Sequence, residues 1–237
     1  MRERLQKIIA SAGIASRRAA ETLIREGHVS VNDEVVTEMG YRADPFRDVI
    51  RVRGVRITSD PVKVYLAVHK PAGYLTAMSD PRGRKIVADL VSDFSERLVP
   101  VGRLDYASEG LLIMTNDGDF SYRVQHPKFN IPKTYLVKVK GSVKAAAFAA
   151  IQGGTRLDDG YFKPDEASIE KVNRRSTWLR FTIHSGRNRI VRRYFETLGF
   201  QVTRLIRTAI GEMDLGTLKP GAFRHLKASE IRQFMPE

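Results

Sequence analysis

Cysteine is absent from the 237-residue sequence, which excludes a disulfide scaffold, a thiolate nucleophile and a zinc site with cysteine ligands. Apolar runs long enough to span a membrane are also missing, and residues 1–4 lead into an amphipathic segment instead of a signal peptide. We therefore expect a cytoplasmic protein without a membrane partner.

Several common catalytic motifs are missing as well. There is no phosphate-binding loop of the GxxxxGK[ST] type, no GxGxxG turn, no GxSxG elbow and no HExxH pair. The five histidines are scattered without the spacing of metal ligands (His28, His69, His126, His184 and His225). A metal site is therefore not expected.

Acidic residues are scarce relative to basic ones. The chain has 27 Asp and Glu against 40 Lys and Arg, which gives a formal net charge of +13 and a pI near 10.1. Between Lys171 and Arg207 there are ten Lys or Arg residues and a single acid, Glu196. Such a run is usually a solvated surface. Here nearby acids are few and most of the cations are arginines, which suit phosphate, so an RNA or DNA partner is favoured.

The first 57 residues predict two short helices followed by a small sheet. Helical spacing of apolar residues begins at Leu5 and breaks at Gly13, and Ser16 is a suitable N-cap for a second helix that ends at Gly27. Two hairpins follow, over residues 29–36 and 49–57. The turn residues 58–61 predict a domain boundary, with one domain over residues 1–60 and a second over 61–237.

The second domain is predicted to be a mixed, largely antiparallel α+β structure. Strand-like runs alternate with turns, and an Ala-rich helix capped by Ser142 ends at residues 153–154. A further helix is predicted over residues 188–198. The predicted strands cover residues 64–68, 98–101, 111–115, 133–140 and 178–183.

The predicted helix at 188–198 has an apolar stripe on one side and Arg189, Arg192 and Arg193 on the other. Like charges three and four residues apart destabilise a helix by about 0.2–0.5 kcal/mol per pair. An anion is therefore needed there, either a phosphate or a carboxylate from elsewhere in the fold.

One carboxylate is a candidate for chemistry. Asp105 follows a predicted strand and lies in a glycine-bounded loop, where a carboxylate can be held at a cleft close to cations. From the residues alone, an aspartate that binds turn backbone remains the commoner interpretation.

Short motifs are spread along the whole chain. In the second domain they are HKPAG at 69–73, GRLD at 102–105, SEGLL at 108–112, TNDG at 115–118, KTY at 133–135 and GRNRIVRR at 186–193. Together and in this order, they resemble the motifs of the RNA pseudouridine synthases of the RsuA/RluB type, which modify uridines in ribosomal RNA. In the first domain the motifs are LQK at 5–7, ASRR at 15–18 and VSVN at 29–32. They resemble the RNA-binding domain of the ribosomal protein S-four type, which this branch carries at its N-terminus.

The resemblance implies an isomerase that breaks the N–C1′ bond of a uridine and rejoins the base through C5, without a cofactor. It implies that Asp105 acts at C1′ or on the base, that Tyr135 stacks on the uracil, and that Arg192 pairs with the Asp105 carboxylate. The substrate is expected to be ribosomal RNA, more specifically that of the large subunit, or a ribosomal assembly intermediate, bound by a monomer. The residues expected to contact RNA are Lys7, Arg17, Arg18, Lys70, Arg103, Arg187, Arg189, Arg193, Arg204 and Arg207.

Two alternatives stay open on the sequence. A ribosome-assembly factor would bind RNA without chemistry, and Asp105→Asn would then leave its function unchanged. An RNA methyltransferase with the same N-terminal module would need a glycine-rich turn for its methyl donor, and the sequence shows none.

Overall fold

The computed structural model describes residues 2–57 and 61–235, which form two compact units. One unit comprises Met1–Val64 with Ser95–Arg97 and Asn116–Gly118, and the other comprises the rest of the chain. The boundary predicted at residues 58–61 falls mostly on residues 58–60, which lie outside the described residues, so its position stays a prediction. In the described part of the chain, no helix has both the length and the apolar character needed to cross a membrane.

The N-terminal unit contains the two predicted helices, α1 (Leu5–Ser11) and α2 (Arg17–Arg25). The Ser16 side chain accepts a hydrogen bond from the Ala19 N–H at 3.1 Å, which confirms the predicted cap. Both helices bury an apolar face against a small sheet. The strands of this unit are β1 (Glu3–Arg4), β2 (Val29–Val31), β3 (Glu34–Val35), β4 (Arg42–Ala43), β5 (Ile50–Val52) and β6 (Val55–Arg56).

The sheet of the N-terminal unit has the order β3-β2-β5-β6, and β1 pairs with β4. The β2–β3 hairpin turns at Asn32 and Asp33, both with positive φ, and the β5–β6 hairpin turns at Arg53 and Gly54 in the same way. Two consecutive residues with positive φ match the right-handed twist of the flanking strands. The two predicted hairpins are therefore confirmed.

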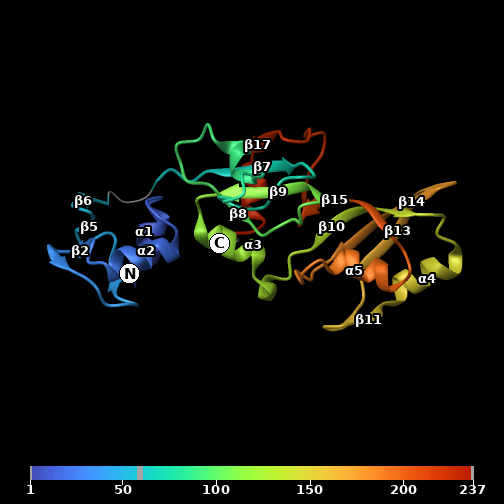
Figure 1. Ribbon diagram of the computed structural model, residues 1–237, viewed down its shortest axis with the longest axis horizontal. Helices are drawn as coiled ribbons and strands as arrows, with labels where there is room; N and C mark the ends of the chain where they lie inside the picture. The colour runs from blue at the N-terminus through green and yellow to red at the C-terminus, as the bar shows by residue number, and fades with distance from the viewer. Residues whose placement is uncertain (1, 58–60, 236–237) are drawn as a thin grey trace. The chain divides into compact units, whose positions relative to one another are not determined.

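The second unit is built on a nine-stranded sheet with the order β13-β14-β10-β15-β9-β7-β17 (Figure 1). Strands β8 and β16 pair with β9 and β15, and only the β15–β9 pair is parallel. A separate hairpin joins β11 (Thr155–Leu157) to β12 (Gly160–Phe162). The strands of the large sheet are β7 (Tyr65–Lys70), β8 (Val99–Val101), β9 (Glu109–Thr115), β10 (Lys133–Lys140), β13 (Glu166–Asn173), β14 (Ser176–Ile183), β15 (Val202–Ile210), β16 (Met213–Asp214) and β17 (Phe223–His225). The α+β class with a mostly antiparallel sheet is confirmed.

Helices cover the sheet of the second unit in two groups. Buried residues of α5 pack with α4 on the part of the sheet formed by β10, β14 and β15, and α3 packs on β9. In Figure 1, α4 and α5 lie together against the β10–β14 side. The helices of this unit are α3 (Gly118–Gln125), α4 (Ala145–Gly153), α5 (Ile190–Thr197), α6 (Ala228–Arg232) and the 3-10 turns η1 (Val87–Val91) and η2 (Pro127–Phe129).

Two predicted helix starts differ from the structure. Helix α4 begins at Ala145 after Lys144, and Ser142 is not its cap, because residues 141–143 bind the Thr177 hydroxyl of β14 instead. Helix α5 begins at Ile190, because Arg189 has a left-handed backbone with φ 48° that precedes the helix. Residues 185–189, which precede α5, line the same cleft as Lys133 and Tyr135 of β10.

Candidate active site

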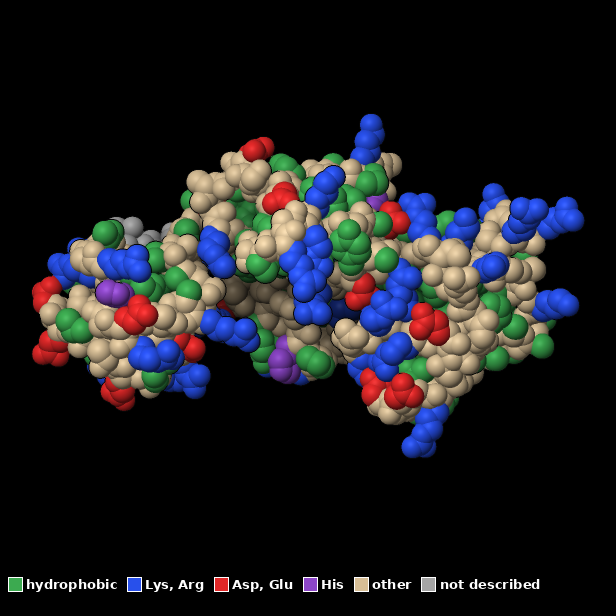
Figure 2. Space-filling view, viewed as in Figure 1, with side chains coloured by type: hydrophobic (Ala, Val, Ile, Leu, Met, Phe, Trp, Pro, Cys, Tyr) green, Lys and Arg blue, Asp and Glu red, His purple; other side chains and the backbone are tan. Residues whose placement is uncertain are grey.

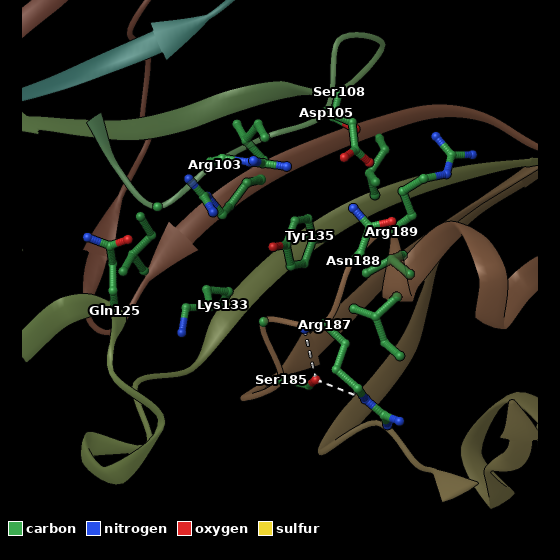
Figure 3. A pocket seen from close by; sticks show the side chains of 18 of the residues that line it. Arg103, Asp105, Ser108, Gln125, Lys133, Tyr135, Ser185, Arg187, Asn188 and Arg189 are labelled. Carbon is green, nitrogen blue, oxygen red and sulfur yellow. Dashed lines mark hydrogen bonds between the residues drawn. The ribbon is translucent and has the colours of Figure 1, made fainter. Parts of the chain in front are cut away.

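Asp105 and Tyr135 line one cleft of the second unit, with a volume of about 370 Å³. The cleft lies between the loop after β8, strands β10 and β15, and residues 185–191 before and within α5. Figure 3 shows the Tyr135 ring between Asp105 on one side and Lys133 on the other. The size falls within the range of about 300–1,000 Å³ of small-molecule sites. Segments between Val101 and Ile210 that are far apart in the sequence therefore converge on one pocket.

The loop that carries Asp105 is fixed by hydrogen bonds on its inner side. The Thr76 hydroxyl donates to the Leu104 carbonyl at 2.7 Å, and the Leu104 N–H donates to the Thr76 hydroxyl oxygen at 3.2 Å. The Ser108 N–H donates to the Asp105 carbonyl at 3.0 Å. These contacts leave the Asp105 side chain half-buried at the cleft, without a hydrogen-bond partner among the described residues.

Lys70 holds the loop from behind. Its ammonium group is fully buried at the end of β7 and donates to the carbonyls of Ser108 at 2.6 Å, Pro71 at 3.0 Å and Tyr106 at 3.5 Å. A phosphate has no access to an enclosed amine whose three donors are already used. The prediction that Lys70 contacts RNA is therefore wrong, and the structure places it beneath the Asp105 loop.

Arg192 of α5 reaches the same loop from the other side. Its Nη2 donates to the Ala107 carbonyl at 3.1 Å and to the Ser108 hydroxyl at 3.4 Å, and its Nη1 donates to the Val202 carbonyl at 3.3 Å. Within the described residues, no ion pair shorter than 4.0 Å joins Arg192 to Asp105. The predicted direct pair is wrong, because Nη2 donates to the Ala107 carbonyl and the Ser108 hydroxyl, and Nη1 donates to the Val202 carbonyl, instead of to the Asp105 carboxylate.

Asp105 nevertheless interacts electrostatically with both buried cations. Burial lowers the pKa of Lys70 to about 8, and the nearby Asp105 opposes that shift. Burial also lowers the pKa of Arg192, with Arg189 adding to the effect and Asp105 opposing it. The aspartate thus lies within the field of two cations that bind the backbone of residues 106–108 instead of its carboxylate.

A second pair of cations lies at the far side of Tyr135. Tyr135 of β10 is opposite Arg207 of β15, so both side chains are on the cleft face of the sheet, and Lys133 lies two residues before Tyr135 on that face. Arg207 is only 4% exposed, and its Nε donates to the Leu111 carbonyl at 2.7 Å. Its buried Nη2 has no hydrogen-bond partner among the described residues. Burial and the Arg207 charge lower the pKa of Lys133 to about 8, and its Nζ donates to the Ile131 carbonyl at 2.8 Å.

Other predicted RNA-binding arginines are held by acids from distant segments. Asp159, in the β11–β12 turn, accepts from Arg187 at 3.0 Å and from Arg193 at 2.8 Å. Arg204 donates to Glu109 at 2.5 and 3.0 Å. The expectation that few acids neutralise the basic segment, residues 171–207, is therefore wrong for these three arginines. For Arg193, the anion that the predicted helix required is a carboxylate from elsewhere in the fold.

The structure brings six of the predicted site residues to the cleft lining: Asp105, Tyr135, Arg103, Arg187, Arg189 and Arg207. Lys70 and Arg192 lie behind the Asp105 loop, Arg193 binds Asp159, and Arg204 lies on the opposite face of β15 from Arg207. Lys7, Arg17 and Arg18 belong to the N-terminal unit, where Arg17 and Arg18 are exposed in the first turn of α2.

Five polar lining residues were missed as site residues: Ser108, Lys133, Gln125, Ser185 and Asn188. Three of them had a signal in the sequence, since Ser108 begins the SEGLL motif, Lys133 precedes Tyr135 in the KTY motif and Asn188 lies within GRNRIVRR. Alternation along a strand places Lys133 on the same face as Tyr135. Gln125 and Ser185 carried no such signal. No group of three His, Asp or Glu side chains able to hold a metal ion occurs in residues 2–57 and 61–235.

Comparison with known proteins agrees with the site. Residues 64–197 match the model of the RNA pseudouridylate synthases, and residues 3–50 match the S4 domain model. An uncharacterized RNA pseudouridine synthase of Mycobacterium bovis is 46% identical over 97% of this chain and 92% of its own. The ribosomal large subunit pseudouridine synthase B of Bacillus subtilis is 42% identical over 98% of this chain and 95% of its own. A solved pseudouridylate synthase is similar with a TM-score of 0.66 and 29% identity, covering 98% and 99% of the two chains.

Proposed function

Since the chain belongs to the RNA pseudouridine synthases and is an RNA isomerase with an N-terminal S4 domain, we propose that it acts on one uridine of large-subunit ribosomal RNA, at a site formed by Asp105 and Tyr135. The observation that carries the site assignment is the shared cleft, in which a half-buried carboxylate faces an aromatic ring with cations beyond it.

Asp105 is the group that acts on the sugar or the base. Breakage of the N1–C1′ bond leaves C1′ electron-deficient, and uracil C6 is electrophilic, so a carboxylate suits either atom. Its lack of a hydrogen-bond partner leaves both oxygens available to the substrate. Lys70 and Arg192 are positioning residues, because they bind the carbonyls of residues 106–108 and so hold the loop that presents Asp105.

Tyr135 provides the surface against which the uracil rotates. A uridine reaches the cleft only after leaving its stack, which costs a few kcal/mol, and stacking on an aromatic ring returns about 1–3 kcal/mol per base. The released base turns so that C5 faces C1′, the C5–C1′ bond forms, and the proton leaves C5 while N1 gains one. The Tyr135 hydroxyl is the nearest candidate to assist removal of that proton.

Arg103, Lys133 and Arg207 bind the anionic parts of the target nucleotide. Arg103 is exposed at the mouth of the cleft, whereas the buried Arg207 has a donor without a partner. A buried unpaired donor costs about 1–3 kcal/mol, and a substrate oxygen would remove that cost on binding. An anionic oxygen near Lys133 would also raise its depressed pKa again.

Ribosomal RNA is the proposed substrate because of two observations. The Bacillus subtilis relative, which matches nearly end to end, is named for the large ribosomal subunit. The S4 unit exposes Arg17 and Arg18 at the N-terminus of α2, where free backbone N–H groups also favour a phosphate. Lys7 is proposed to contribute to the same contact, and the RNA is either free or within an assembly intermediate.

The test is pseudouridine formation in transcripts of large- and small-subunit ribosomal RNA, incubated with the purified protein and no added cofactor. We expect product only in the large-subunit transcript. Asp105→Asn should abolish product while the dissociation constant for RNA stays within about threefold, and Asp93→Asn, which changes an exposed aspartate of the same unit, should be fully active. Product formed by Asp105→Asn would refute the site, and product confined to the small-subunit transcript would refute the substrate.

A further inference from the structure

Acidic side chains neutralise only some of the cations in the basic segment, residues 171–207. Arg180 donates to Glu170 at 2.7 Å, and Arg187, Arg193 and Arg204 have the acidic partners described above. The other cations that precede residues 185–191 in the sequence are Lys171, Arg174 and Arg175. They are exposed and have no ion pair among the described residues. None of the three lines the cleft.

Strand pairing places two more cations beside these three. Lys171 of β13 is opposite Trp178 of β14, and Trp178 is opposite Lys138 of β10, so the three side chains form one row across the sheet. Lys140 is opposite Ser176 in the next row, and the Gly141 N–H donates to the Arg175 carbonyl at 2.9 Å, which brings the turn between β13 and β14 beside it. Lys138 and Lys140 also have no ion pair in the described part of the chain.

This row lies on the face of the sheet opposite the cleft. Along β10, Tyr135, Val137 and Val139 are buried under α4 and α5, whereas Lys138 and Lys140 alternate with them. Along β14, Thr177 and Leu179 are buried and Trp178 is half-exposed. The Lys138 ammonium lies 5.5 Å from the Trp178 ring centroid, a cation–π contact that keeps the amine above the sheet.

Positive charge also gathers at this end of the unit. Figure 2 shows several Lys and Arg side chains on the surface where β13 and β14 lie. Residues two apart on a strand are about 6.8 Å apart, and neighbouring strands are about 4.8 Å apart. Lys138, Lys140 and Lys171 on this grid are spaced on the scale of successive phosphates of a nucleic-acid strand, and Arg174 and Arg175 lie in the turn that joins β13 to β14.

We propose that Lys138, Lys140, Lys171, Arg174 and Arg175 form a second RNA-binding surface, the hairpin patch, which binds the phosphate backbone of the substrate RNA away from the target nucleotide. The proposal rests on the proposed function only in that it requires an RNA substrate longer than the part that enters the cleft. Because the hairpin patch and the cleft are on opposite faces of the sheet, its phosphates belong to a different segment of the RNA. Contacts of this kind carry affinity and salt dependence without sequence information.

The test compares two triple variants with equal loss of charge. K171Q/R174Q/R175Q removes the exposed cations of the hairpin, and K219Q/K227Q/R232Q removes three exposed cations of the C-terminal segment. We expect the first variant to raise the dissociation constant for a full-length large-subunit transcript at least about tenfold. The slope of log Kd against log salt should become shallower by about 2, as expected for three lost phosphate contacts. The second variant should match the parent protein.

Turnover separates this surface from the catalytic site. At saturating RNA, both triple variants should form pseudouridine at the parental rate, with unchanged thermal unfolding. An unchanged dissociation constant, an equal loss in both variants, or a loss of turnover at saturation would overturn the proposal. Weakened binding confined to ribosomal particles, with normal affinity for the bare transcript, would overturn it in favour of an acidic protein partner. If the parent protein forms no product while the hairpin variant still binds RNA more weakly, the proposed function fails and the surface stands.

Discussion

Replacement of Lys70 by methionine tests how the Asp105 loop is held. The amine is fully buried and donates to three carbonyls at 2.6, 3.0 and 3.5 Å, two of them in the loop. Methionine fills a similar volume but cannot donate, so the loop carbonyls lose their partner at a cost of about 1–3 kcal/mol for each buried group. We expect the rate at saturating RNA to fall at least about tenfold, while the dissociation constant for RNA stays within about threefold.

The pH dependence of stability provides a second readout of the same residue. The pKa of Lys70 is about 8 in the folded chain against an ordinary 10.5, so keeping the amine charged in the interior costs about 3 kcal/mol. Below pH 8 both states are protonated and the full cost is present. Between pH 8 and 10.5 the folded state loses its proton before the unfolded state does, so the free energy of unfolding rises with pH. From pH 7 to pH 9.5 this rise amounts to about 2 kcal/mol.

Urea unfolding of both proteins at pH 7 and pH 9.5 measures that rise. The parent should gain about 2 kcal/mol more than Lys70→Met over this interval, since all other titrating groups are common to both and cancel in the difference. Lys85→Met, which removes an exposed lysine, should follow the parent. Parallel pH profiles for the parent and Lys70→Met would show that the Lys70 amine is not desolvated, and the assignment of its role beneath the loop would fail.

Two further substitutions test neighbouring contacts. Arg192→Ala removes the donors to Ala107 and Ser108, so the rate at saturating RNA should fall about a hundredfold with little change in RNA affinity; a collapse of affinity with normal turnover would instead make Arg192 a phosphate ligand. Gly110→Ala should lower the free energy of unfolding by about 3 kcal/mol in urea titrations, because the new Cβ would lie 2.3 Å from the Arg207 carbonyl oxygen at a backbone φ of +109°. Gly141→Ala, with φ +86° and no atom within 4 Å, isolates the backbone strain and should cost only about 1 kcal/mol; equal losses in the two glycine variants would refute the close approach.

Local features of this fold were predictable because they depend on a few neighbouring residues. Ser16 caps α2 through the N–H of Ala19, and both hairpins of the N-terminal unit turn at the predicted residues. The strand at 133–140 and its alternation follow from the same short-range pattern. The cleft was predictable only through the resemblance of the motifs, since neither composition nor spacing shows that the loop at 105 meets β10.

The ion pairs were not predictable, because their partners are far apart in the sequence. Asp159 lies 28 residues from Arg187 and 34 from Arg193, and Glu109 lies 95 from Arg204. A count of acids within the basic segment cannot include these partners. Lys70 was misplaced for a related reason, since the charge of its side chain suggested a surface position. It ends a strand inside the sheet, opposite Gly110 of β9, and its amine is enclosed by the carbonyls of Pro71, Tyr106 and Ser108. A run of apolar residues shortly before it in the sequence is the one trace of this burial.

Alternation along the strands explains how one sheet serves two surfaces. Arg204 and Arg207 are three residues apart on β15, so their side chains point to opposite faces: Arg207 lies opposite Tyr135 in the cleft, and Arg204 lies opposite Lys138 on the reverse face. The basic segment therefore does not form one continuous patch. Its buried members hold or line the cleft, and its acid-paired members stabilise the fold. Of the members without an ion pair in the described part of the chain, Lys171 is beside Trp178 on the reverse face, and Arg174 and Arg175 lie in the adjoining turn. Because the sheet separates the two faces, RNA bound at the hairpin patch does not compete with the flipped uridine for the cleft. The free-energy cost of unstacking that uridine can therefore be offset by phosphate contacts made elsewhere on the same RNA.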